Sequence, residues 1–158
     1  MSVASDRRGP VISRPATARP ALSVTGITQN SGDRLEHWIT RAREYADEVG
    51  LLVDESSTDD TYDLAREHAD SVRLVEHPPY IEVYYDLALR HAGGEWILWL
   101  DDDELMNVGF AGSRDEMLSD RFVTHFLLPY RWVIPAAAVE PGQEGFRWLS
   151  SFPWHPDP

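Results

Sequence analysis

The sequence contains no cysteine and no lysine. Without cysteine, disulfide bonds, thiolate metal sites and cysteine nucleophiles are excluded. All 14 cationic residues are arginines, against 27 acidic residues, and the formal net charge is −13. This charge argues against broad nucleic-acid binding and against electrostatic attachment to anionic lipids. An anionic ligand would be repelled by this net negative charge unless positive charge is supplied locally. A bridging divalent cation can supply it.

The sequence also lacks long apolar runs. No stretch approaches the roughly 18 consecutive apolar residues of a membrane span, and residues 1–20 have no apolar segment typical of a signal peptide. We interpret residues 1–20, which hold three prolines and four arginines, as a flexible tail. We expect a cytoplasmic protein and leave membrane association through a partner open. With 158 residues, 42% of them hydrophobic, the rest of the chain can form one domain with a real core.

Strand and helix patterns alternate along the chain. Short apolar runs predict strands at 21–28, 50–55, 71–77 and 95–101. Apolar positions at three-and-four spacing predict a helix over 31–49, and capping and periodicity predict two more, one from the segment 56–61 to about 69 and one over 81–92. This order predicts an α/β fold with a mostly parallel sheet, right-handed crossovers and helices on both faces.

The pattern is looser after Glu104. Residues 112–120 are compatible with a short helix, and residues 123–134 with a further strand that Pro129 places at an edge or bulge. Four aromatic rings crowd the end of the chain, at Phe146, Trp148, Phe152 and Trp154. These rings need a packing partner, so either the sequence is a fragment or the chain pairs with a second copy through them.

Acidic and polar residues follow three of the predicted strands, as "TQN", "DESSTDD" and "DDDE". Ligands of parallel sheets bind at the carboxyl ends of the strands, so the three clusters should converge at one edge. Adjacent carboxylates repel one another, and the run Asp101–Glu104 should cost stability unless a cation compensates it. Side chains alternate at a strand end, so Asp101 and Asp103 can point together while Asp102 points away.

Two carboxylates on one side can hold Mg²⁺ or Mn²⁺ together with a substrate diphosphate and water. The alternative interpretation of the run is a solvated acidic loop. Asp54, at the end of another strand, can accept a hydrogen bond from the imide or amine edge of a base. The segment after it supplies helix caps, for which Ser57, Thr58 and Asp59 are suited.

Other candidates are weaker. His68, His77 and His91 have no ligand spacing, which favours core or surface roles. Tyr84 and Tyr85 are interpreted as helix packing rather than ligand stacking. Glycine-rich phosphate loops, metalloprotease helices and nucleophile elbows are absent from the sequence, which removes several enzyme classes.

Three segments, in order, resemble the family 2 glycosyltransferases with the GT-A fold: "ITQN" (27–30), "VDESSTDDT" (53–61) and "LALRHAGGEWILWLDDDE" (87–104). The resemblance implies a Rossmann-like nucleotide-diphospho-sugar transferase domain over 21–158. In it, residues 21–106 would form the nucleotide-sugar-binding part and residues 107–158 a partial acceptor-side region.

The resemblance implies roles for single residues. Asp101 and Asp103 would form the Asp-x-Asp (DXD) motif that binds Mn²⁺ or Mg²⁺ and the diphosphate. Five residues would contact the nucleotide, with Asp54 at the base and Asp102 facing the ribose: Thr28, Asn30, Asp54, Glu55 and Asp102. Glu104 would support the loop from behind. The family's base lies in an acceptor-binding half, for which Asp157 is the candidate here, ahead of Glu140 and Glu144.

The implied reaction moves a sugar from a UDP-sugar or another nucleotide-sugar to a glycan, lipid or small-molecule acceptor, with inversion at the anomeric carbon. The sequence departs from the family pattern at Tyr84–Asp86, where relatives often carry Ala-Arg-Asn, and at Ser56, which replaces a glycine. Few residues remain for an acceptor-binding half, which predicts a shortened enzyme. The alternatives are a catalytically incomplete binding or assembly module, and a nucleotidyltransferase. The latter usually has a basic residue after its first strand, which "ITQNSGD" does not supply.

Overall fold

The computed structural model describes residues 12–13, 20–107, 109–126 and 128. The chain divides into two units, Met1–Asp120 and Arg121–Pro158. In the second unit the described residues, 121–126 and 128, form neither helix nor strand, so this part of the strand expected over 123–134 is wrong. The remainder of that segment lies outside the described residues. The fold and site below belong to the first unit.

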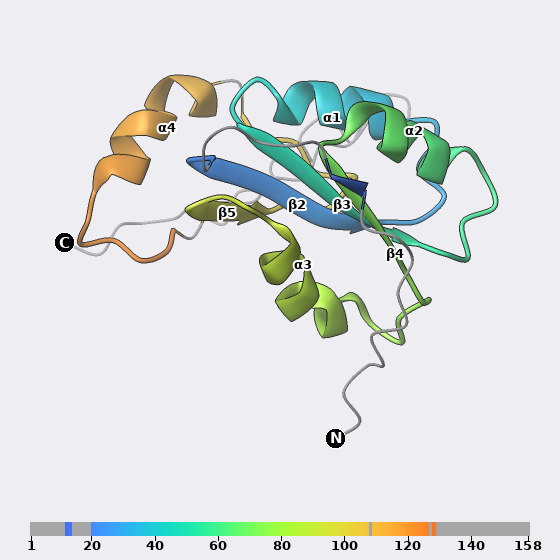
Figure 1. Cartoon of the computed structure of the whole chain (residues 1–158). Coiled ribbons are helices and arrows are strands. Elements are labelled where there is room, and N and C mark those ends of the chain that lie inside the picture. Colours follow the sequence, from blue (N-terminus) through green and yellow to red (C-terminus); the bar gives the residue numbers. More distant parts are fainter. Residues whose placement is uncertain (1–11, 14–19, 108, 127, 129–158) are drawn as a thin grey trace, which may run out of the picture. The chain divides into compact units, whose positions relative to one another are not determined.

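The sheet has five strands in the order β1-β4-β3-β2-β5 (Figure 1). The four long strands are parallel, as predicted for an α/β fold: β2 (Leu22–Thr28), β3 (Glu48–Asp54), β4 (Ser71–Val75) and β5 (Trp96–Trp99). The edge strand β1 (Ile12–Ser13) pairs antiparallel with β4. The expectation of a flexible tail is therefore wrong at these two residues, because each pairs with a residue of β4, Ile12 with Val72.

The strand order reverses beside β2. The chain passes from β2 to β3 to β4 in one direction and returns to place β5 on the other side of β2. Crevices at such a switch point, outside the carboxyl ends of the strands, are where open α/β sheets bind ligands. The ends of β2 and β5 are therefore the part of the fold to search for a site.

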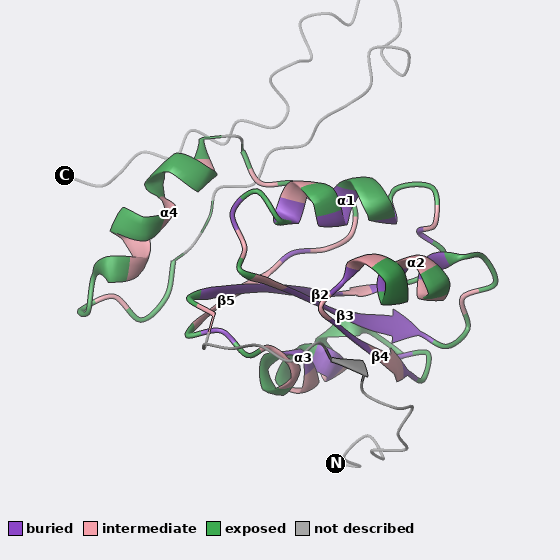
Figure 2. Ribbon diagram, turned by 45° about the horizontal axis from the view of Figure 1, so that its top comes forward, coloured by how far each residue is buried: buried purple, intermediate pink, exposed green. Residues whose placement is uncertain are grey.

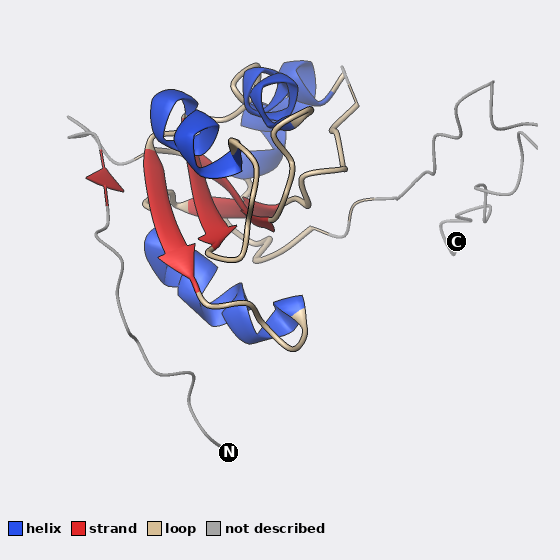
Figure 3. Ribbon diagram, turned by 90° about the vertical axis from the view of Figure 1, so that its right-hand side faces the viewer, coloured by secondary structure: helices blue, strands red, loops and turns tan. Residues whose placement is uncertain are grey.

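Helices cover both faces of the sheet (Figure 3). One face carries α1 (Leu35–Ala42) and α2 (Thr61–His68), and the other carries the short 3-10 helix η1 (Ile81–Tyr84) and α3 (Tyr85–His91). A further helix, α4 (Phe110–Ser119), contacts the core through Phe110 and Leu118. In the described part of the chain, no helix has the length and apolarity needed to cross a membrane.

The helix expected over 31–49 is shorter in the structure. α1 ends at Ala42, a turn follows, and β3 begins at Glu48. Asp47 ties this segment to the start of β2, because its carboxylate accepts the backbone N–H groups of Ala21 and Leu22 at 2.9 and 3.0 Å. The apolar spacing continues past the helix because Tyr45 is buried in the turn and Val49 is buried in the strand.

The core has one part on each face of the sheet. β2 and β3 are buried along almost their whole length, whereas the outer faces of α1 and α2 are exposed (Figure 2). The larger cluster lies under α1 and α2 and is centred on Leu35, Trp38 and Ile39. The smaller cluster lies under α3 and includes Leu52 and Ala88. Burial of these apolar side chains provides most of the driving force for folding.

Gly26 of β2 lets the end of β5 lie directly against it. The N–H of Leu100 donates to the carbonyl oxygen of Thr25 at 3.0 Å, and a methyl group on Gly26 would stand 2.3 Å from the carbonyl oxygen of Leu100. Replacing Gly26 by Ala should lower the free energy of unfolding by about 2–3 kcal/mol, because the neighbouring backbone must shift. Urea denaturation measures this loss.

The matched control for Gly26 is Gly112 of α4, where an added methyl group meets no atom within 4 Å. Replacing Gly112 by Ala should leave stability unchanged or raise it by about 0.5–1 kcal/mol, since alanine is the better helix former. Equal stabilities for the two variants would contradict the packing described at Gly26.

Candidate functional site

A hollow of about 280 Å³ opens at the carboxyl ends of the strands. It is lined by Ile27, Thr28, Gln29, Asp54, His77, Pro78, Tyr80, Ile81, Asp101, Asp102 and Asp103. The structure thus brings together five of the residues that the sequence analysis singled out, on the ends of β2, β3 and β5. The remaining described candidates, Asn30, Glu55 and Glu104, are not among the lining residues.

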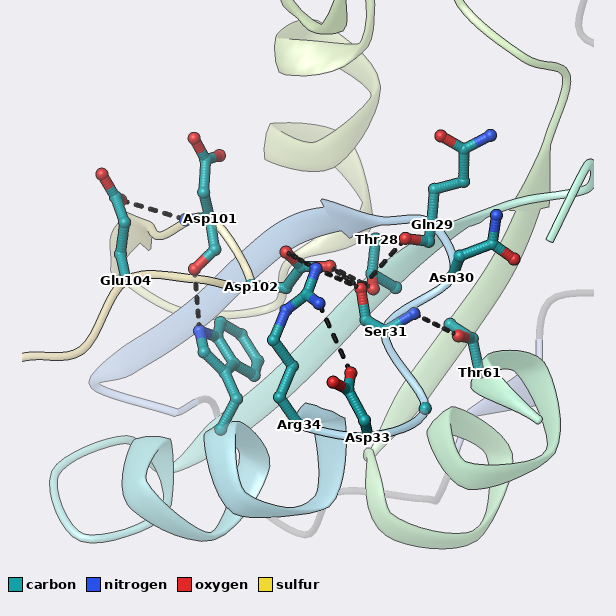
Figure 4. A network of polar contacts seen from close by, with 12 residues as sticks. Thr28, Gln29, Asn30, Ser31, Asp33, Arg34, Thr61, Asp101, Asp102 and Glu104 are labelled. Atoms are coloured by element: carbon teal, nitrogen blue, oxygen red, sulfur yellow. Dashed lines mark hydrogen bonds and ion pairs between the residues drawn. The ribbon is translucent and has the colours of Figure 1, made fainter. Parts of the chain in front are cut away.

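Asp102 joins the end of β5 to the loop after β2. Its carboxylate accepts hydrogen bonds from the hydroxyl groups of Thr28, at 2.5 Å, and of Ser31 (Figure 4). It also forms an ion pair with Arg34 at 3.2 Å. The backbone N–H of Ser31 donates in turn to the Thr61 hydroxyl of α2 at 2.7 Å. Only 14% of the Asp102 side chain is exposed. Both carboxylate oxygens bind protein donors and Asp102 also lines the hollow, so its contact with a ribose stays a prediction.

Arg34 is the cation that partly compensates the acidic run. It follows directly after the segment "ITQNSGD", in which the sequence analysis found no cation, and it lies at the amino-terminal end of α1. Its guanidinium contacts both the Asp102 carboxylate and, at 2.9 Å, the Ser31 hydroxyl. Some of the repulsion between neighbouring carboxylates is therefore balanced by the protein itself.

Asp101 and Asp102 point in different directions, as the alternation at a strand end predicts (Figure 4). The Asp101 carboxylate accepts the indole N–H of Trp99 at 2.9 Å, and its backbone carbonyl accepts the indole N–H of Trp38 at 2.9 Å. Its backbone N–H donates to the Glu104 carboxylate at 3.1 Å. Glu104 thus contacts the backbone of the acidic loop, and its supporting role at a metal site stays a prediction.

Asp101 and Asp103 have the chemistry that a hard divalent cation requires. Both border the hollow, Asp101 half-buried and Asp103 exposed. Within the described residues no group of three histidine or acidic side chains is close enough to hold a metal by itself. Mg²⁺ and Mn²⁺ usually take only one or two protein carboxylates and complete their shell with phosphate and water. The two aspartates therefore fit such an ion in the presence of a diphosphate.

Asp54 lies at the end of β3, where its side chain is only 3% exposed. One carboxylate oxygen accepts the backbone N–H and the hydroxyl of Ser56, at 2.8 and 2.7 Å, and the other lies 2.6 Å from Nδ1 of His77. Burial favours the neutral acid, but the hydrogen bonds from Ser56 and the contact with His77 outweigh it and hold the pKa of Asp54 below its ordinary value. Asp54 is therefore a carboxylate at neutral pH.

His77 lines the hollow, although sequence reasoning favoured a core or surface role for it. It lies two residues beyond the end of β4, which pairs with β3 so that Val75 is opposite Asp54. This parallel register brings His77 beside the Asp54 carboxylate. Gln29 completes the cluster, because its amide nitrogen donates to the Ser56 hydroxyl at 2.7 Å. The signal in the sequence was topological, since neighbouring parallel strands place their carboxyl ends together.

Asn30 connects two loops rather than lining the hollow. Its side-chain oxygen accepts the backbone N–H of Thr58 at 2.8 Å, and its backbone has a φ of 48°, in the left-handed region that asparagine tolerates. Glu55 is exposed, and its backbone N–H donates to the carbonyl oxygen of Val75 at 2.8 Å. The predicted nucleotide contacts of these two residues have no counterpart in the lining of the hollow.

A packing role is confirmed for Tyr84, whereas Tyr85 is 40% exposed and packs only in part. Tyr84 is 8% exposed and belongs to the core cluster under α3, and the Tyr85 ring meets that of Trp99 edge-to-face at 4.4 Å between centroids. The candidate base Asp157, the weaker candidates Glu140 and Glu144, and the aromatic rings at 146–154 lie outside the described residues.

Comparisons with known proteins give a family and a similar structure. The model of the family described as "Glycosyl transferase family 2" matches residues 23–112. The structure is similar to that of a mannosyltransferase, PcManGT from Pyrobaculum calidifontis, solved in complex with GDP-Man and Mn²⁺, with a TM-score of 0.51 and 26% sequence identity. The match covers 73% of this chain and 37% of that one. No curated protein matches the sequence.

Proposed function

Because the chain belongs to glycosyl transferase family 2, we propose that it transfers a sugar from a nucleotide-sugar donor to an acceptor, with a divalent cation and with inversion at the anomeric carbon. The observation that carries the proposal is the single hollow shared by Asp54, Asp101 and Asp103. It has one end beside His77 and an acidic end suited to a metal-bound diphosphate. The Mn²⁺ and GDP-Man of the similar mannosyltransferase support the same reading.

In the proposed mechanism, each residue at the strand ends has a distinct task. Asp101 and Asp103 would hold Mn²⁺ or Mg²⁺, which would act as a Lewis acid toward the departing diphosphate. Asp102, fixed by Thr28, Ser31 and Arg34, keeps the loop between these two carboxylates in place.

The two parts of the chain would have separate roles. We propose that residues 21–106 bind the donor and that residues 107–158 contribute to the acceptor side, and the family match over 23–112 supports the first assignment. Asp157 is the proposed base that removes the acceptor proton. That assignment comes from the sequence, since Asp157 lies outside the described residues.

Calorimetry tests the donor site. The chain is titrated with GDP, UDP, ADP and CDP, each with Mn²⁺ and with EDTA, and we expect binding that is lost when EDTA removes the metal. Asp115→Asn is a control variant for the acidic residues of the site. It removes one acidic charge from an exposed position on α4 and should leave nucleotide binding unchanged. A folded sample that binds no nucleoside diphosphate in the presence of Mn²⁺ would remove the proposal.

A product assay separates the alternatives that the sequence left open. Glycosyl transfer or donor hydrolysis releases the nucleoside diphosphate from the nucleotide-sugar. A nucleotidyltransferase would instead release pyrophosphate from a nucleoside triphosphate and a sugar phosphate. Metal-dependent nucleotide binding with neither product, over a panel of glycan, lipid and small-molecule acceptors, would identify a binding module and contradict the proposed transfer.

A further inference from the structure

The Asp54 carboxylate borders the hollow, but both of its oxygens already have protein partners. Ser56 donates two hydrogen bonds to one oxygen, and the other oxygen faces Nδ1 of His77 at 2.6 Å. The Asp54 side chain is 3% exposed, whereas that of His77 is 63% exposed and lines the hollow. A nucleotide base that approaches this end of the hollow therefore meets the imidazole first, with Asp54 behind it.

The hydrogen-bond partner of Nδ1 determines whether Nε2 of His77 is a donor or an acceptor. Asp54 is an anion at neutral pH, because its pKa lies below the ordinary value, and an anion accepts hydrogen bonds. In the neutral imidazole this contact favours the tautomer with the ring proton on Nδ1, pointing at Asp54. The other ring nitrogen, Nε2, carries a lone pair and acts as an acceptor. The Asp54 carboxylate thus fixes both the tautomer and the orientation of the ring, as carboxylates do for histidines that bind metals.

The surroundings of His77 suit a base. Pro78, Tyr80 and Ile81 follow it along the chain and line the same hollow, and Ile27 lines it from β2. These side chains offer apolar contact for the faces of a flat ring. Polar recognition of the ring edge is then left to the cluster of His77 and Gln29.

We propose that His77 selects the base of the donor nucleotide, accepting at Nε2 a hydrogen bond from a ring N–H of guanine or uracil, and that Asp54 is a positioning residue that acts through it. This inference rests on the proposed function. Guanine carries an N–H at N1 and uracil at N3, whereas adenine and cytosine present a lone pair at the corresponding ring positions. Two lone pairs would then face each other, which is unfavourable for ADP and CDP.

Competition among the four nucleoside diphosphates with Mn²⁺ tests the preference in the unaltered chain. We expect GDP and UDP to bind about 10-fold or more tightly than ADP and CDP, the effect of one satisfied hydrogen bond against one unpaired acceptor. Equal binding of all four would overturn the inference and leave the proposed function intact. If none of the four bound, the proposed function would fail and the inference with it.

Variants locate the preference in His77. His77→Phe keeps a flat ring but has no ring nitrogen, so the affinities for GDP and UDP should fall to within about 3-fold of those for ADP and CDP. His77→Gln can donate to Asp54 through its amide and accept from the base through its oxygen, and it should keep most of the preference. The matched control is His37→Phe, at an exposed position of α1, which should leave the ratio unchanged.

A ratio of affinities distinguishes base selection from a structural role. If His77→Phe weakened all four nucleotides by the same factor, the residue would serve the shape of the site alone and the inference would be wrong. Asp54→Asn should also reduce the GDP to ADP ratio, because a neutral amide no longer fixes the proton on Nδ1. Circular dichroism checks that each variant is folded. If His77→Phe does not fold, the ratio in the unaltered chain decides by itself.

Discussion

Replacing Trp38 by Ala is expected to lower the free energy of unfolding by about 3–5 kcal/mol, the cost typical of removing a large buried aromatic side chain. Trp38 is 2% exposed and is the largest of the fully buried side chains of the described residues. It packs in the cluster between α1 and the sheet, together with Leu35 and Ile39. Its removal leaves a cavity that the surrounding strands can fill only in part. Urea denaturation followed by far-ultraviolet circular dichroism measures the loss.

The same residue connects the core to the site. The indole N–H of Trp38 donates to the backbone carbonyl of Asp101 at 2.9 Å, so the position of the acidic loop depends on a core side chain. Trp38→Phe keeps most of the apolar contact but loses this hydrogen bond, and it should cost about 1–2 kcal/mol. Nucleotide affinity should fall in this variant, because Asp101 is held less firmly. A loss below about 1 kcal/mol for Trp38→Ala would show that the site tolerates the cavity and that the described packing is wrong.

Much of the sheet could be predicted because its strands carry local signals. Residues 50–53 and 96–100 are apolar runs that end in acidic residues, and such runs are typical of parallel strands covered on both faces. The alternating order of the elements then places the ends of β3 and β5 at one edge. The parallel topology alone therefore predicts that Asp54 and the acidic run lie at the same edge of the sheet.

Helix boundaries were harder to predict, for a physical reason. Tyr45 and Val49 continue the spacing of the buried positions of α1, but they are buried in a turn and in a strand. A periodic pattern records which residues face the core and cannot show where the backbone changes from helix to strand. The segment between α1 and β3 is held by a tertiary contact that no local pattern records, in which Asp47 binds the backbone of residues 21 and 22.

The polar partners at the site could not be read from the sequence because they come from distant segments. The hydroxyl of Ser31 and the carboxylate of Asp102 are 71 residues apart, and Asp54 and His77 are 23 residues apart. A histidine at a strand end is ordinary by itself, and its role follows only when its neighbour is a buried carboxylate. The sequence therefore identified the acidic residues of the site but missed His77 and Arg34, which determine how two of these carboxylates are used.

Asp102 and Asp103 are adjacent in the sequence, but their replacements should affect different properties. Replacing Asp102 should lower stability, and replacing Asp103 should lower nucleotide affinity. Asp102→Ala should lower the free energy of unfolding by about 2–4 kcal/mol, because it removes the acceptor of the buried Thr28 hydroxyl group and one acceptor each of Ser31 and Arg34. The loop after β2 would then lose its attachment to β5. Asp102→Asn keeps one acceptor oxygen and should cost less, about 1 kcal/mol. Urea denaturation of the three proteins gives the comparison.

Asp103→Ala is the matched counterpart of Asp102→Ala. It removes an equal charge from the next residue, which is exposed. Its stability should change by no more than about 0.5 kcal/mol, as is usual at the surface. Its metal-dependent affinity for nucleoside diphosphates should fall by about 100-fold or more, since losing a metal ligand costs at least as much as losing the support of one. If Asp103→Ala were the destabilised variant, or if Asp102→Ala unfolded no more easily than the unaltered chain, the division of labour within the acidic run would be wrong. A metal held by Asp102 would then fit the data better than one held by its neighbours.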